Sequence, residues 1–157
     1  MFSSTAEYAL RAVVQLATQP ENALTAQAIA KVTRVPAGYL SKILQDLAKA
    51  GIVNSQRGPN GGFTLASRPD RLTVLDVVNA VDPIRRITDC PLGLPEHGKN
   101  LCRLHRRLDD AIALVETSFR EATIQDMMSP SRSGTRCLFP TVDRKPIAEP
   151  KRRNVKK

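Results

Sequence analysis

Three cysteines, Cys90, Cys102 and Cys137, carry the most versatile chemistry in this 157-residue sequence. Thiolates bind soft metal ions and take part in redox reactions. An odd number of cysteines argues against a framework of structural disulfides and favours a reducing compartment. We therefore interpret the cysteines as candidates for metal ligation or redox chemistry.

A second candidate feature is the stretch RGPNGGF at residues 57–63, in which four of seven residues are Gly or Pro. Short β-prone runs at residues 52–53 and 63–65 flank it, which predicts a β-hairpin. The glycines allow a tight turn and a close approach of the backbone to another chain, such as a sugar-phosphate chain. Arg57 could then reach a phosphate or a narrow minor groove. An ordinary hairpin turn is the alternative interpretation.

Three helices are predicted ahead of this hairpin. Apolar periodicity indicates helices over residues 4–17, from Thr25 to Val32, and from Pro36 to Gly51, and residues 4–7 have the spacing of a capping box. The third helix has an apolar stripe and a polar face that carries Tyr39, Ser41, Lys42 and Gln45. A short helix, a turn at residues 34–36 and an amphipathic helix form a helix-turn-helix pattern. A hairpin placed directly after it would be a wing.

The second half of the chain is predicted to form a short helix, an irregular segment and a long helix. A helix is expected over residues 73–81, where Pro83 prevents it from continuing, and the aperiodic segment that follows contains Cys90 and His97. A long helix is expected from about Leu101 toward Gln125, and its stripe is too long for one small domain to cover, which predicts pairing with a second subunit. That stripe consists of Leu101, Leu104, Leu108, Ile112, Val115 and Phe119.

The predicted fold class is therefore mainly α with a small β-hairpin wing. Residues 1–82 would form a winged helix-turn-helix DNA-binding domain, 83–100 a loop, 101–127 a dimerisation helix and 128–157 a basic disordered tail. Residues 131–157 hold nine Lys or Arg against Asp143 and Glu149, and residues 31–71 hold seven against Asp46 and Asp70. A basic block of this kind suits a polyanion such as DNA, although a merely solvated face is the alternative.

Other classes of protein are disfavoured. No Gly-rich phosphate loop, nucleophile elbow or paired carboxylates appear, so an enzyme is not expected. No run of about 18 apolar residues could span a bilayer, and no signal pattern opens the chain. We expect a cytoplasmic protein with no membrane partner.

Several motifs together resemble the Rrf-two (Rrf2) family of bacterial winged-helix regulators, over about residues 1–126. They are EYALR at 7–11, AIA at 28–30, Tyr39-Leu40, GIV at 51–53 and above all RGPNGGF at 57–63. The resemblance implies a homodimer on a partly palindromic double-stranded DNA operator, with the third helix in the major groove and the wing at the adjacent minor groove. The candidate DNA-binding residues are then Tyr39, Ser41, Lys42, Gln45, Arg57, Gly58, Asn60 and Gly61.

The resemblance also implies that the loop at residues 83–100 is a sensor loop, because sensor members of the family hold an iron-sulfur cluster with three cysteines. This sequence departs from that pattern: it has Cys90, His97, Cys102 and His105 in the region, with His97 where the middle cysteine is expected. Thiolates and imidazoles could hold a 2Fe–2S cluster or, equally, Zn²⁺. In the nitric-oxide sensor type a carboxylate of the other subunit completes the site, and Glu7 falls at the matching position. Glu7 also suits a capping box with Ser4.

The predicted function is thus a dimeric DNA-binding regulator that senses iron-sulfur, redox or nitric-oxide status. The alternative is a regulator of the same fold without any cofactor, switched by thiol oxidation or by a small-molecule ligand. Cys137 lies outside the matched region and is not assigned to the site.

Overall fold

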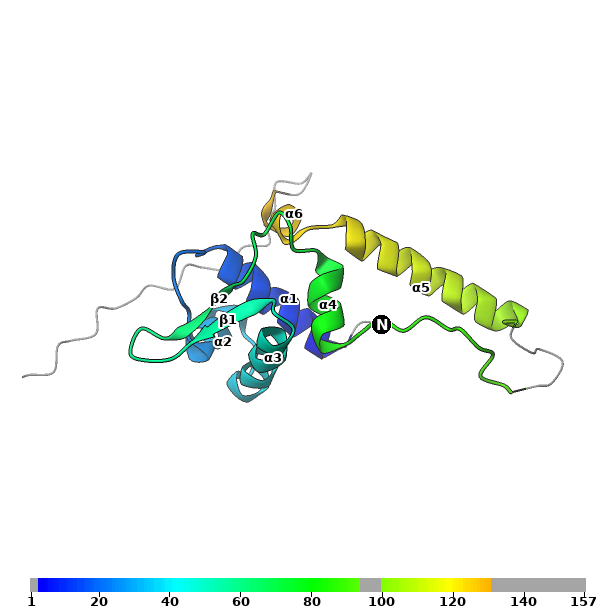
Figure 1. The fold of residues 1–157 in the computed structure, drawn as a ribbon, viewed down its shortest axis with the longest axis horizontal. Coiled ribbons are helices and arrows are strands. Elements are labelled where there is room, and N and C mark those ends of the chain that lie inside the picture. Colours follow the sequence, from blue (N-terminus) through cyan, green and yellow to red (C-terminus); the bar gives the residue numbers. More distant parts are fainter. Residues whose placement is uncertain (1–2, 94–99, 131–157) are drawn as a thin grey trace, which may run out of the picture.

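The computed structural model describes residues 3–93 and 100–130 of the chain, which folds into six helices and one two-stranded hairpin within those ranges (Figure 1). His97, Cys137 and the predicted tail beyond residue 130 lie outside the described residues. The elements are α1 (Ser4–Ala17), α2 (Ala26–Thr33), α3 (Ala37–Lys49), β1 (Val53–Gln56), β2 (Gly62–Leu65), α4 (Val74–Val81), α5 (Arg103–Glu121) and α6 (Ile124–Met128).

The start of α1 differs from the prediction. Ser3, in extended conformation, is the N-cap, and its hydroxyl accepts a hydrogen bond from the Ala6 N–H at 3.2 Å. Ser4 is already helical and cannot cap, so the predicted capping box of Ser4 and Glu7 is wrong. The Glu7 carboxylate instead pairs with Arg11 one turn later, the favourable spacing for opposite charges on a helix.

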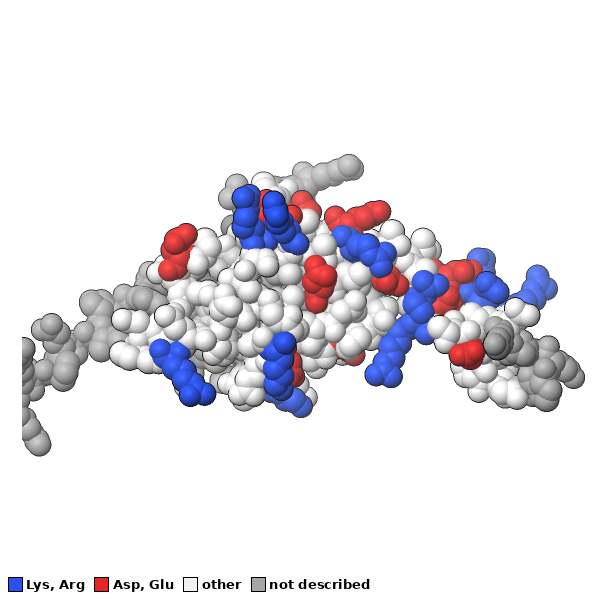
Figure 2. All heavy atoms as spheres, viewed as in Figure 1, with Lys and Arg blue, Asp and Glu red and all other residues white. Residues whose placement is uncertain are grey.

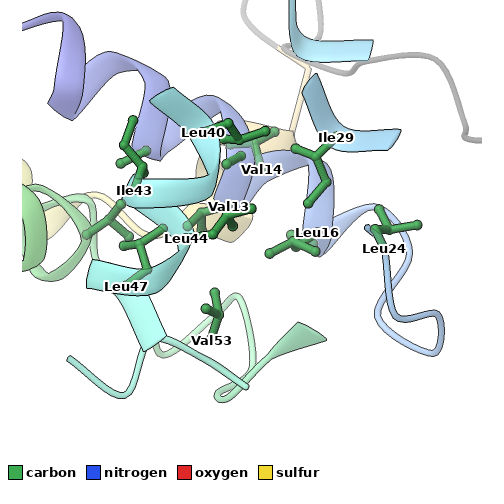
Figure 3. Close-up of a cluster of buried hydrophobic side chains, with 14 of the residues drawn as sticks. Val13, Val14, Leu16, Leu24, Ile29, Leu40, Ile43, Leu44, Leu47 and Val53 are labelled. Atoms are coloured by element: carbon green, nitrogen blue, oxygen red, sulfur yellow. The ribbon is translucent and has the colours of Figure 1, made fainter. Parts of the chain in front are cut away.

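The core of the N-terminal half surrounds α1. Figure 3 shows Val13 of α1 beside Leu44 of α3. Leu16 of α1 and Leu47 of α3 belong to the same cluster, and all four side chains are almost completely buried. The same cluster includes Ile29 from α2 and Val53 from β1. The predicted apolar stripe of the third helix is therefore confirmed as the face that packs inward, and it leaves the polar face of α3 exposed.

The hairpin pairs β1 and β2 in antiparallel register, from Val53 opposite Leu65 to Gln56 opposite Gly62. Leu24, in the connection between α1 and α2, joins its edge through two backbone bonds with Phe63, at 3.0 and 2.8 Å. The hairpin is therefore fixed to the helical body rather than attached only at its base.

The long C-terminal helix is shorter than predicted. α5 begins at Arg103 with Cys102 as its N-cap and ends at Glu121, not near Gln125. Ala122 adopts an extended conformation because its carbonyl accepts from the Val74 N–H (2.9 Å), and the Ile124 N–H donates to the carbonyl of Leu72 (2.8 Å). Ile124, the first residue of α6, is fully buried.

α5 projects from the helical body and is largely uncovered along its length (Figure 1). Among its 19 residues, all of which the structure describes, Asp109 is the one buried side chain. Leu104 is 63% exposed and Leu108 47% exposed, although both belong to the apolar stripe. None of the described helices is long and apolar enough to cross a membrane.

Gln15 is a polar exception in the core. Its side chain is fully buried in α1, and neither its amide nitrogen nor its amide oxygen meets a hydrogen-bond partner among the described residues. Burying unsatisfied polar atoms costs about 1–3 kcal/mol. We expect Gln15→Met, which conserves length and volume, to raise the free energy of unfolding by about that amount in urea denaturation. The exposed Gln27→Met is the control and should change it by less than about 0.5 kcal/mol; destabilisation by Gln15→Met would contradict the prediction.

Candidate functional site

The helix-turn-helix is held in one geometry by its turn. Arg34, the C-cap of α2, is left-handed with φ 57°, which reverses the chain between the helices. Val35 is buried and anchors the turn in the core. The Arg11 guanidinium donates to the carbonyl of Thr33 at 3.3 Å, so α1 also restrains the end of α2. Together these contacts set the direction in which α3 presents its polar face.

That polar face carries the four predicted contact residues. Tyr39, Lys42 and Gln45 are exposed, whereas Ser41 is half-buried and donates its hydroxyl to the Ala37 carbonyl at 3.0 Å. The Tyr39 ring packs edge-to-face against Tyr8, with 6.4 Å between ring centroids. Figure 2 shows Lys and Arg side chains projecting from the edge of the molecule where α2 and α3 lie. The structure therefore presents a polar and basic helix face at the surface.

Contacts within the protein itself explain why two positions of the wing require glycine. The Gly61 N–H donates to the Gly58 carbonyl at 2.8 Å, and a Cβ on Gly61 would lie 2.5 Å from the Gln56 carbonyl oxygen. A Cβ on Gly62, with φ 154°, would lie 2.6 Å from the carbonyl oxygen of Leu24. Gly61 and Gly62 thus approach this chain's own backbone closely, while an approach of the loop to a sugar-phosphate chain stays a prediction. Arg57, Gly58 and Asn60 are exposed at the tip, and a Cβ on Gly58 would meet nothing within 4 Å.

Substitution of Gly62 is a direct test of this packing. We expect Gly62→Ala to lower the free energy of unfolding by about 2–3 kcal/mol, because the added carbon meets backbone atoms of Leu24 that cannot move independently. Gly38→Ala is the matched control: that site is helical with open space around it, so the same change should stabilise by about 0.5–1 kcal/mol. Equal effects of the two substitutions in thermal denaturation would contradict this account.

Cys90, Cys102 and His105 converge at the N-terminal end of α5. Their ligand atoms all lie within 4.8 Å of one another. The Nδ1 atom of His105 lies 3.1 Å from the Cys102 Sγ and 3.6 Å from the Cys90 Sγ. Cys102 is the N-cap of α5 and His105 lies in the first turn of that helix, while Cys90 is buried and comes from the segment after α4.

This donor set fits a metal of the soft class. A tetrahedral ion with bonds of about 2.3 Å to sulfur and about 2.0 Å to nitrogen has ligands roughly 3.6 Å apart, close to the separations found here. Hydrogen bonds from the backbone N–H and then the ring of His105 lower the pKa of the Cys102 thiol to about 7. A thiolate, the form that binds metals, is therefore accessible at neutral pH.

Of the other predicted ligands, Glu7 is not part of this group within one chain. Glu7 lies on α1, paired with Arg11, and is not among the three clustered residues. His97 lies outside the described residues, so its ligand role stays a prediction. A role for Glu7 across a subunit boundary also stays a prediction.

Sequence analysis missed an ion pair beside the group. The Asp109 carboxylate accepts from the Arg86 Nε at 2.6 Å, from the Arg86 Nη2 at 2.5 Å and from the Ile87 N–H at 2.9 Å. The Arg86 hydrogen bonds, followed by that of Ile87, lower the pKa of Asp109 to about 2. Because the folded-state pKa is below the ordinary value, this pair stabilises the fold above about pH 4, and its contribution is lost as the pH falls toward 2. No local sequence signal links residues 23 positions apart.

A helix-turn-helix followed by a hairpin wing, with a Cys/His group at the start of an exposed helix, defines a winged-helix transcriptional regulator. The chain belongs to the Rrf2 family, whose model, described as an iron-dependent transcriptional regulator, matches residues 2–130. The recognition made from the sequence motifs is confirmed. Its relatives are named as regulators, and the chain is a DNA-binding transcription factor rather than an enzyme.

Relatives and solved structures agree with this assignment. A protein of Aquifex aeolicus (strain VF5), named among the HTH-type transcriptional regulators, is 32% identical over 132 residues, which cover 82% of this chain and 92% of that protein. The regulator NsrR of Shouchella clausii is 27% identical over 130 residues, covering 80% and 87% of the two chains.

Two solved structures share the winged-helix fold. T. potens IscR superposes with a TM-score of 0.67 at 23% identity, over 81% of this chain and 85% of that one. CymR, the global cysteine regulator of B. subtilis, superposes with a TM-score of 0.63 at 27% identity, over 80% and 94%. The predicted fold class is thereby confirmed.

Proposed function

We propose that this protein is a homodimeric regulator whose affinity for a DNA operator depends on the state of Cys90, Cys102 and His105. The observation that carries the proposal is the position of this group, between the end of α4 and the first turn of α5. It therefore connects the DNA-binding half to the exposed helix. The iron-dependent description of the family and the likeness to NsrR support an iron-based signal.

The proposed division of labour follows the predicted boundaries. Residues 1–82 bind DNA, 83–100 sense, 101–127 form the dimer, and the basic residues 128–157 add salt-dependent attraction to phosphates. On α3, Tyr39, Ser41, Lys42 and Gln45 would contact base edges or nearby phosphates in the major groove. At the wing, the contacts would come from Arg57, Gly58, Asn60 and Gly61.

We propose an iron-sulfur cluster, of the 2Fe–2S type, as the resident cofactor, with Zn²⁺ as the alternative. Cys90, Cys102 and His105 would hold it, completed by His97 or by Glu7 of the second copy. The bound cluster would supply a centre that reacts with oxidants or nitric oxide. Holding the cluster would fix residues 84–90, the Cys90 segment, against α5. This would change the spacing between the α3 helices of the two copies. A coupling of about 1.4 kcal/mol changes operator affinity tenfold.

A thiol switch without a cofactor is the second candidate, favoured by the lowered pKa of Cys102 and its closeness to Cys90. Two thiols would lose two electrons and two protons to a peroxide, which is reduced to water or an alcohol, and a disulfide would form between them. Such a disulfide would likewise join the segment after α4 to α5.

Purification without oxygen, with iron, sulfide and zinc analysis, tests these candidates. Operators would then be selected from random duplexes with the loaded, empty and peroxide-treated protein. A coloured, iron-containing sample whose operator affinity depends on loading supports the cluster. A metal-free sample that responds to peroxide supports the thiol switch. Operator binding that is indifferent to all three states would contradict both candidates.

A further inference from the structure

One buried carboxylate fastens the Cys90 segment to α5. Asp109 makes a two-pronged ion pair with Arg86 and accepts the backbone N–H of Ile87, so three hydrogen bonds of 2.5–2.9 Å converge on a single side chain. The Asp109 side chain is 12% exposed, whereas that of Arg86 is 44% exposed. The carboxylate therefore lies beneath the guanidinium, where solvent competes weakly for the contact.

The location of this contact relates it to the Cys/His group. Asp109 lies four residues after His105 on α5, so the imidazole and the carboxylate lie on the same helix face, about 6 Å apart along the axis. On the other side of the contact, Ile87 precedes Cys90 by three residues. The carboxylate thus joins the chain just before Cys90 to the helix turn just after His105.

The network continues along α5 beyond this point. Arg86 also approaches Glu116 at 3.8 Å, and Glu116 pairs with Arg120 at 2.5 Å. At its start, the same segment is held to α4 by the Ile84 N–H, which donates to Asn79 at 3.0 Å. Residues 84–90 are therefore bound to α4 at one end and to α5 at the other.

We propose that Asp109 is the positioning residue of the Cys/His group: by holding residues 86–87 on α5, it keeps the Cys90 thiol beside Cys102 and His105. The inference rests on the proposed function, because Asp109 would act only by positioning the Cys/His group. Without this contact, the segment must be ordered when a ligand binds, and that ordering weakens affinity. Such supporting partners of ligand residues typically contribute 10- to 100-fold to metal affinity.

Cobalt binding is the first test, with Co²⁺ as the probe for a tetrahedral thiolate site in metal-free, reduced protein. All variants carry Cys137→Ser, so that only Cys90 and Cys102 can supply thiolates to the cobalt. We expect Asp109→Asn to bind Co²⁺ about 10- to 100-fold more weakly. At equal occupancy, its thiolate-to-cobalt absorption should fall toward that of Cys90→Ser, a change that general destabilisation does not produce. Asp110→Asn, the same charge change at the exposed neighbouring position, should match the parent protein.

A metal-independent test separates positioning from metal function. Diamide, a two-electron thiol oxidant, should close a Cys90–Cys102 disulfide about tenfold more slowly in Asp109→Asn than in Asp110→Asn. Slower closure in a protein that never binds Co²⁺ would refute the metal proposal and leave the positioning role in place. Parent-like behaviour of Asp109→Asn in both assays would overturn the positioning role.

If circular dichroism shows that Asp109→Asn does not fold, a second variant tests the same contact. Arg86→Lys keeps the charge but cannot form the two-pronged contact. We expect this variant to show an intermediate loss of Co²⁺ affinity and of disulfide rate. Parent-like values for a folded Arg86→Lys, in the absence of a folded Asp109 variant, would count against the proposal.

Discussion

Replacing both Leu104 and Leu108 with glutamate is expected to make the protein monomeric and to weaken operator binding at least ~100-fold. Both side chains are large, apolar and exposed on α5, which has one buried side chain among its 19 residues. In the proposed dimer they would be covered by the same helix of the second copy, and burying two carboxylates there is strongly unfavourable. A monomer would also have to bind each operator half-site separately.

Sedimentation velocity and fluorescence anisotropy on the selected operator would measure the two effects. Thr117→Glu is the control, because Thr117 is exposed on the opposite face of α5 and its substitution leaves the stripe intact. We expect this control to remain dimeric with unchanged affinity. A doubly substituted protein that still sediments as a dimer would refute the assignment of α5 as the dimer helix.

Cys102→Ser is expected to lower the affinity for cluster or metal by at least ~100-fold, more than loss of a supporting residue would. Cys102 is both the N-cap of α5 and one of the three clustered ligands, and its lowered pKa makes it the readily available thiolate. A serine hydroxyl remains protonated at neutral pH and is a poor ligand for soft metals. Iron and zinc content after anaerobic purification would measure the change.

The effect on DNA binding separates sensing from folding. Serine is a good N-cap, so α5 should keep its start and the protein its thermal stability. We expect Cys102→Ser to bind the operator as the empty form does, with no further response to iron, zinc or peroxide. Cys137→Ser, outside the matched region, should retain the parent metal content. Parent-like metal content in Cys102→Ser would remove the Cys/His group from the proposed function.

The candidate site was only partly predictable. Cys102 and His105 could be paired from the sequence because three residues on a helix return to the same face. Cys90 could be associated with them only through the family resemblance, since its partners come from another element. Asp109 and Arg86 were missed because the approach of their side chains depends on how the segment after α4 crosses α5. The wing was located correctly, but the close contact of Gly62 with Leu24 was not foreseen.

Local patterns in the sequence were sufficient to predict the order of helices and hairpin, the inward stripe of α3 and the family, because periodicity and turn residues act over a few neighbouring positions. The cap of α1 at Ser3 rather than Ser4 is a local feature that the sequence pattern did not locate. The packed fold decided which glycines are required and that α5 ends at Glu121. It also decided which carboxylate holds the Cys90 segment. These features depend on backbone and side-chain contacts between elements distant along the chain, and such contacts exist only once the whole domain has packed.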